Sequence, residues 1–174
     1  MENTENPTQL DLNSINISKV PHFKLSGEYQ CKIQHVYDGD TPTIVLKLPG
    51  IEQFFAFNVR LYGIDTPEVK GDLSVSGFVS RNKLIQLTTD QQIDINAKLT
   101  TQELNKIFEN NKLLLKAFIH DQQDKYGRPL ATLYNQNIGD ISVNQILITQ
   151  GFAKEYFGGK KTLLSVAEKC SKIN

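Results

Sequence analysis

The segment FFAFNVRLYGIDTPE, residues 54–68, is the most informative part of the chain for its fold. Its apolar side chains fall at every second position, which is the period of a half-buried strand: Phe55, Phe57, Val59 and Leu61. Because successive side chains of a strand point to opposite faces, Arg60 is expected on the face opposite Phe57 and Val59. The alternation then ends, which predicts a loop that carries Asp65 and Glu68.

The flanking sequence predicts further short strands and several helices. Strands are expected at residues 29–37, 44–48, 113–119 and 130–134. Helices are expected at residues 76–89, after the capping pattern of Thr100 and Glu103, after Ser142, and along a final apolar stripe: Leu163, Val166, Ala167 and Cys170. Short antiparallel strands with an interposed helix predict a β-barrel plus helices (α+β). We expect a five-stranded Greek-key OB-fold barrel with three helices and one inserted short helix.

Length and composition predict one domain. The chain has 174 residues, of which 39% are hydrophobic and 22% charged, as in ordinary globular proteins. We expect a disordered polar tail at 1–25 and one domain at 26–174, with an insertion at about 90–111. The net charge is zero, so bulk charge gives no argument for nucleic-acid binding. The first residues lack the apolar run of a signal peptide, and no membrane span is present, which leads us to expect a cytoplasmic protein.

The sequence Asp38-Gly39-Asp40-Thr41 has two interpretations. Asp-Gly is a turn dipeptide, so the simplest one is a hairpin turn. The other is a site for a hard cation, because carboxylate oxygens such as those of Asp40 suit Ca²⁺ or Mg²⁺. A single carboxylate does not make such a site.

The sequence from Arg60 to Glu68 is similarly open to two interpretations. It is either a solvated strand end or a loop that presents two carboxylates for different tasks. Pro67 favours an extended conformation at the residue before it, which would hold the loop in one shape. One of Asp65 and Glu68 would then hold a metal ion, and the other would accept a proton from water.

A third segment, residues 124–129, reads DKYGRP. It is either a tight turn, with Gly127 at a positive φ, or a phosphate clamp. In the clamp, Arg128 supplies a planar pair of donors, with Lys125 and Tyr126 in support. The three segments together offer two arginines and several carboxylates. That set suits the metal-assisted hydrolysis of a phosphodiester, in which arginines stabilise charge on the phosphate oxygens.

Four segments between Val36 and Lys154 resemble the staphylococcal nuclease (thermonuclease) family, and they stand in the order of that family: VYDGDTPTIVL, FNVRLYGIDTPE, DKYGRPLATLY and SVNQILITQGFAK. The resemblance implies one Ca²⁺ ion, held by Asp40, Asp65 and the backbone carbonyl of Thr66. It implies Glu68 as general base, and contacts to the scissile phosphate from Arg60 and Arg128. Lys125 and Tyr126 would contact a terminal phosphate, and Asp38 would support the metal ligands.

Other substrate contacts are less closely matched. Tyr156 and Lys160 lie where the family places contacts to the nucleotide and the nucleic-acid backbone, although a solvated helix start would also explain Lys160. The resemblance implies a calcium-dependent endonuclease that cuts DNA and RNA, with single strands preferred. We expect a monomer that does not associate with membranes.

Two alternatives to the nuclease remain. One is a non-catalytic module of the same fold that binds nucleic acid or protein. The other is a barrel that binds single strands and does not cut them, for which strong salt dependence is expected.

Overall fold

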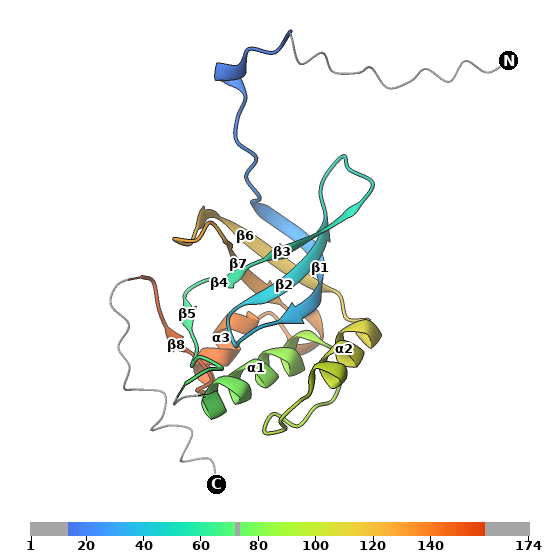
Figure 1. Ribbon diagram of the computed structural model, residues 1–174, viewed down its shortest axis with the longest axis vertical. Coiled ribbons are helices and arrows are strands. Elements are labelled where there is room, and N and C mark those ends of the chain that lie inside the picture. The colour runs from blue at the N-terminus through green and yellow to red at the C-terminus, as the bar shows by residue number, and fades with distance from the viewer. Residues whose placement is uncertain (1–13, 72–73, 159–174) are drawn as a thin grey trace, which may run out of the picture.

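A computed structural model of the protein describes residues 14–71 and 74–158 (Figure 1). Its main feature is a curled six-stranded sheet with the order β3-β2-β1-β6-β7-β4. The strands are β1 (Gly27–Val36), β2 (Pro42–Lys47), β3 (Phe54–Asn58), β4 (Arg60–Leu61), β6 (Leu115–Gln123) and β7 (Pro129–Tyr134). Neighbouring strands are antiparallel except for β4 and β7, which are parallel, so the sheet is mixed.

The strand expected across residues 54–61 is divided at Val59. Its first half, β3, pairs with β2, and its second half, β4, pairs with β7 at the other end of the sheet. One residue thus separates the two ends of the sheet along the chain, which is possible only because the sheet curls. The alternation is confirmed, since Val59 and Leu61 are buried while Arg60 faces the other way.

The fold class is α+β, as expected, but the five-stranded closed barrel is not confirmed. The main sheet has six strands, and within the described residues no ladder joins β3 to β4. The physical reason is that the two halves of one segment take different partners. A second, two-stranded sheet is formed by β5 (Ile64–Asp65) and β8 (Lys154–Glu155), which are antiparallel.

Three α-helices are described: α1 (Ser74–Thr88), α2 (Thr101–Asn110) and α3 (Val143–Thr149). The capping pattern before α2 is confirmed, because the Glu103 backbone N–H donates to Thr100 Oγ1 and the Thr100 N–H donates to the Glu103 carboxylate. Ser142 likewise accepts from the Gln145 N–H at the start of α3. The helix expected from Leu163 onward lies outside the described residues.

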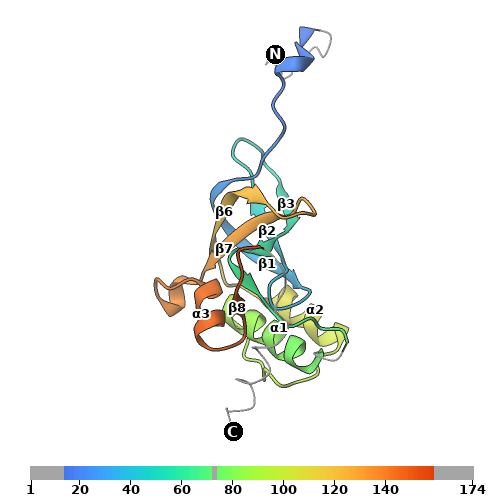
Figure 2. The same ribbon diagram turned by 90° about the vertical axis from the view of Figure 1, so that its left-hand side faces the viewer.

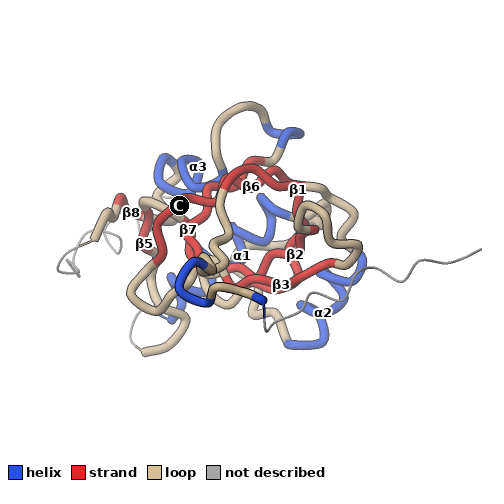
Figure 3. The backbone as a smooth tube through the Cα atoms, turned by 90° about the horizontal axis from the view of Figure 1, so that it is seen from above, coloured by secondary structure: helices blue, strands red, loops and turns tan. Residues whose placement is uncertain are grey.

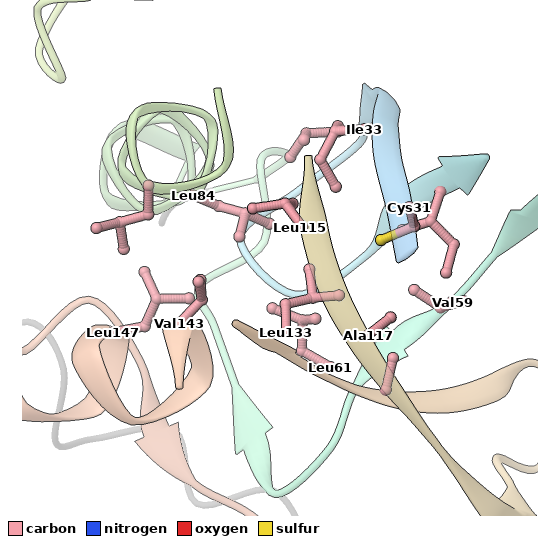
Figure 4. Close-up of a cluster of buried hydrophobic side chains, with 14 of the residues drawn as sticks. Cys31, Ile33, Val59, Leu61, Leu84, Leu115, Ala117, Leu133, Val143 and Leu147 are labelled. Carbon is pink, nitrogen blue, oxygen red and sulfur yellow. The ribbon is translucent and has the colours of Figure 1, made fainter. Parts of the chain in front are cut away.

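The core fills the space between the curled sheet and helices α1 and α3 (Figure 3, Figure 4). Burial of each aliphatic side chain here contributes about 1.5–3 kcal/mol relative to exposure. The side chains drawn include Ile33 of β1, Leu115 of β6, Leu133 of β7, Leu84 of α1 and Leu147 of α3, all of them at most 2% exposed. No helix of the described residues is long and apolar enough to cross a membrane.

The expected insertion at 90–111 forms a loop and helix α2, which packs against β1. Leu104 of α2 is buried, and the Phe108 ring lies edge-on to His35 of β1 at 5.9 Å. Asn82 of α1 donates to the backbone carbonyls of Ile95 and Ala97 and so ties the loop to the core. Figure 1 shows α2 on the opposite side of the molecule from β5 and β8.

Candidate active site

A cleft of about 730 Å³ collects the three polar segments singled out from the sequence. It lies where the β1–β2 loop, strands β4 and β5, the β6–β7 turn and the segment after β8 meet. The residues lining it include Asp38, Thr41, Arg60, Glu68, Lys125, Tyr126, Arg128, Tyr156 and Phe157. Residues as far apart in the chain as Tyr37 and Gly158 thus share one site.

Asp40 is not part of the cleft lining but bonds to the lining residues Thr41 and Arg60, and 2% of its surface is exposed. Its carboxylate accepts hydrogen bonds from Arg60 Nη1 at 2.9 Å, from the Thr66 backbone N–H at 3.0 Å and from the Thr41 hydroxyl at 3.0 Å. The bond to Thr66 joins the β1–β2 loop directly to the segment after β5. Asp40 therefore holds two of the three sequence segments together.

Burial raises the pKa of Asp40, and the nearby Asp38 carboxylate raises it further, to about 7. Arg60 and the hydrogen bonds from Thr41 and Thr66 act in the opposite direction but do not outweigh burial. Asp38 is itself buried and accepts from the Asp40 backbone N–H at 3.2 Å. The site is therefore acidic beyond what Arg60 compensates, which is an arrangement that a bound cation would stabilise.

Arg60 bridges the two acidic residues expected to bind metal. Its Nη1 contacts Asp40 and its Nη2 contacts Asp65, each at 2.9 Å, and its side chain is 17% exposed. Burial lowers the pKa of Arg60, but the neighbouring carboxylates outweigh burial and raise it overall, so the guanidinium stays charged. Two charge-assisted bonds fix the orientation of the guanidinium at the edge of the cleft.

Two glycines allow the backbone to pack closely around these carboxylates. A Cβ at Gly39 would lie 2.8 Å from both Ser80 Cβ of α1 and Thr66 Cγ2. A Cβ at Gly77 of α1 would overlap the Glu68 carbonyl and lie 2.7 Å from the Val69 nitrogen. Helix α1 thus supports the backbone of Glu68 directly, and this contact explains a glycine inside a helix.

The β6–β7 turn positions Arg128 through Asp124. The Asp124 carboxylate accepts from the backbone N–H groups of Tyr126 and Arg128 at 2.9 Å each, and from Arg128 Nε at 2.6 Å. Gly127 has φ +79°, as the turn interpretation requires. The guanidinium lies 5.6 Å from the centre of the Tyr126 ring, over which Lys125 Nζ also lies at 4.9 Å. The expected turn and the expected cationic cluster are therefore the same structure.

The remaining expected residues are placed as follows. Glu68 is exposed at the cleft, on the segment whose Pro67 is buried. Tyr156 is half-buried, and its backbone N–H donates to the Gly63 carbonyl at 2.9 Å. Lys160 lies outside the described residues. The structure thus brings all the other expected residues to one site, while their roles remain predictions.

Two further residues lie at the site: Lys154 was not singled out from the sequence, and Phe157 directly follows the expected nucleotide contact Tyr156. Lys154 Nζ lies 3.7 Å from an Asp65 carboxylate oxygen across the β5–β8 pair. The Phe157 ring packs over Gly63 and lies edge-on to Tyr62 at 5.8 Å. Lys154 ends the segment SVNQILITQGFAK, and the resemblance of this segment to the family was the sequence feature that could have indicated Lys154 as a site residue. No pattern in the sequence indicated a pairing of two-residue strands.

The donor set suits a hard cation. Carboxylate and carbonyl oxygens are the ligands of Ca²⁺ and Mg²⁺, and Asp40, Asp65 and Thr66 carry oxygens of these kinds. Residues 14–71 and 74–158 contain no group of three or more His, Cys, Asp or Glu side chains arranged to hold a metal. A cation here would therefore need a backbone carbonyl or water beside the two carboxylates.

The fold and the site define an α+β protein with a charged cleft that is lined by carboxylates and by two arginines. Comparison with family models adds the family: the model described as staphylococcal nuclease homologue matches residues 58–172, more than half of the chain, and the chain belongs to that family. The search of curated proteins found no match. The family match begins after Asp40, yet the bonds from Asp40 to Arg60 and Thr66 join it to the matched region.

Proposed function

We propose that the protein is a calcium-dependent endonuclease that hydrolyses phosphodiester bonds of DNA and RNA, with single strands preferred. The observation that carries this proposal is that Arg60, Arg128 and Glu68 line one cleft, and that Arg60 also bonds to the buried carboxylates of Asp40 and Asp65. On this proposal β3 and β4 are the two halves of one strand, and the six strands correspond to the five of a Greek-key barrel.

The two arginines bind the scissile phosphate. Each guanidinium offers paired donors to phosphate oxygens, and each is already oriented by a carboxylate, Arg60 by Asp40 and Asp65 and Arg128 by Asp124. Because the donors are fixed before substrate arrives, little reorganisation is needed as charge accumulates in the transition state. Lys125 and Tyr126, beside Arg128, contact a terminal phosphate, and Tyr156 and Lys160 contact the nucleotide and the backbone.

Asp40, Asp65 and the carbonyl of Thr66 would hold Ca²⁺. When bound, the ion supplies positive charge that neutralises the phosphate and lowers the barrier to its attack by water. Both carboxylates must be ionised to serve, so the raised pKa of Asp40 makes cation and proton competitors for the same group.

Glu68 is the candidate general base. It is exposed to the cleft, where a water molecule has access. Of the two carboxylates in residues 60–68, Asp65 is buried and Glu68 is not. Its carboxylate accepts the proton of the attacking water. The close packing of Gly77 against the Glu68 backbone restrains the position of this residue at the cleft.

The test is cleavage of denatured DNA and of RNA with Ca²⁺, with EDTA, and with the Glu68→Gln variant. Glu52→Gln is the matched control, because Glu52 is exposed and lines a different hollow from the cleft. Cutting that requires Ca²⁺, is lost in Glu68→Gln and persists in Glu52→Gln would support the nuclease. A folded protein that cuts nothing with any divalent cation would refute it.

One observation favours the second candidate, a non-catalytic binding module. Arg60 already pairs with both carboxylates expected to hold metal, so these residues also make a self-contained structural cluster. The family includes nucleases as well as non-catalytic members. Under this reading the protein would bind nucleic acid or a protein partner equally well with and without EDTA.

A further inference from the structure

Four rings form a continuous row that leads out of the cleft. Phe157 lies edge-on to Tyr62 with ring centres 5.8 Å apart, and Tyr62 stacks on His120 at 4.0 Å with an interplanar angle of 28°. Phe118 then lies edge-on to His120 at 5.0 Å. We call these four residues the aromatic row. They come from β6, the β4–β5 turn and the segment after β8.

Strand register places the outer end of the row on the outer face of the sheet. Phe118 and His120 are two residues apart on β6, so their side chains share one face, and the residues between and beside them, Ala117 and Ile119, are buried. Phe118 is 39% exposed. Figure 2 shows β6 and β7 side by side, as their ladder requires. A large ring thus remains accessible at the end of the row.

The packing around His120 holds the middle of the row in place. Its Nε2 lies 2.9 Å from the Thr132 hydroxyl of β7, which fixes the plane of the ring against Tyr62. Burial lowers the pKa of His120 despite the nearby Asp121, so the ring is neutral near pH 7. A neutral, oriented imidazole acts here as an aromatic surface and not as a charge.

The inner end of the row belongs to the cleft. Tyr62 and Phe157 line it together with Arg60 and Arg128. Charge is small at the outer end: Lys116, two residues before Phe118, pairs with Glu28 at 3.3 Å and lies over the Tyr134 ring at 5.2 Å. The row therefore offers accessible ring surface at its two ends, where Phe157 is 73% and Phe118 39% exposed, rather than a phosphate-binding surface.

We propose that the aromatic row is a stacking subsite for unpaired bases, along which a single strand of nucleic acid extends from the cleft across β6. Every base has a ring face, so such a row binds single strands with little sequence preference, whereas the bases of a duplex are already stacked. A protein partner is less favoured, because the row runs into a cleft built from phosphate-binding side chains. This inference rests on the proposed function for the position of the strand in the cleft.

The test measures binding without catalysis. Fluorescence anisotropy follows labelled deoxythymidine oligomers of four and twelve nucleotides in EDTA, using the full chain with Glu68→Gln as background. Removing one stacking ring weakens binding by about fivefold or more per base. Phe118→Ala should therefore weaken binding of the twelve-mer at least about fivefold and leave the four-mer unchanged. Phe118→Tyr should restore the affinity, because it keeps the ring.

Phe54→Ala is the matched control, since Phe54 is also an exposed ring on a strand but lies at the far end of the sheet order, on β3. It should bind both oligomers like the parent protein. Equal affinity of Phe118→Ala and parent for the twelve-mer would overturn the proposal, as would equal weakening by Phe54→Ala. Length-dependent binding through Phe118, together with no cleavage in Ca²⁺ by the chain that keeps Glu68, would retain the subsite and reject the nuclease. Cleavage by the chain, together with an unchanged affinity of Phe118→Ala for the twelve-mer, would retain the nuclease and reject the subsite.

Discussion

Replacing Gly77 by alanine separates two opposite expectations for the stability of this protein. Helix propensity alone predicts that alanine at an interior position of α1 stabilises the fold by about 1 kcal/mol. The structure predicts the reverse. The new Cβ would lie 2.7 Å from the Val69 nitrogen and would overlap the Glu68 carbonyl, and both of these are backbone atoms.

The size of the effect follows from the distance that must open. Non-bonded heavy atoms pack without strain at about 3.5–4.0 Å. Helix α1 and the Glu68 backbone must therefore move apart by about 1 Å to accommodate the new Cβ. Overpacking of this kind costs about 1–3 kcal/mol, which outweighs the gain in propensity. A displacement of a catalytic group by about 1 Å can lower the rate about 100-fold. We therefore expect Gly77→Ala to lose up to about 2 kcal/mol of stability and, on the proposed function, to cut DNA far more slowly.

Urea unfolding and initial rates on denatured DNA measure the two effects. Val75→Ala in the same helix is the control, because Val75 is 74% exposed and should change neither quantity appreciably. A Gly77→Ala variant that is more stable than the parent would refute the reasoning, since the close contact of α1 with Glu68 could not then exist. A less stable variant with unchanged cleavage would keep the contact and remove its proposed role in positioning Glu68.

Three further changes probe other parts of the structure. Asn144→Leu should cost about 2–4 kcal/mol in denaturant unfolding, because its amide serves one backbone N–H and two carbonyls, and equal stability would contradict this. Asp38→Asn should shift the acidic limb of the activity–pH profile to lower pH, because it removes a charge that raises the pKa of Asp40; an unmoved limb would show that Asp38 has no such effect. Thr100→Ala should lower stability by about 1 kcal/mol through loss of the α2 cap while cleavage stays unchanged, and reduced cleavage would mean that the insertion contributes to the site.

Sequence patterns correctly predicted the structural features that depend only on residues close together in the chain. The alternation around Val59, the capping box at Thr100 and the cap at Ser142 each depend on residues within a few positions of one another, and each is present. The division of the strand at Val59 was not predictable in this way. It depends on how far the whole sheet curls, which is set by contacts between segments distant in sequence.

The same distinction holds for the candidate site. The motifs supplied Arg60, Glu68 and Arg128 because each lies in a compact, recognisable segment. They did not reveal that Arg60 bridges two carboxylates. The alternation predicts on which face of the strand Arg60 lies, but not which residues it contacts there. Phe118 and His120 gave no signal either. The stacking of His120 on Tyr62, which places Phe118 at the end of the row, depends on β4 lying beside β7, and only the assembled sheet determines this.

Asp40 connects the stability of the fold with the proposed chemistry. Its pKa is raised from 3.8 to about 7, so protonation of Asp40 stabilises the fold fully below pH 3.8, and this stabilisation is lost as the pH rises towards 7. At neutral pH and above, the folded chain therefore holds a buried negative charge that Arg60 does not fully compensate. A cation that binds this carboxylate restores the lost stability in that pH range, because binding to the folded state alone shifts the unfolding equilibrium. The burial that makes an ionised Asp40 costly to the fold is thus the same property that would make the binding of a cation there stabilising, as the proposed function requires.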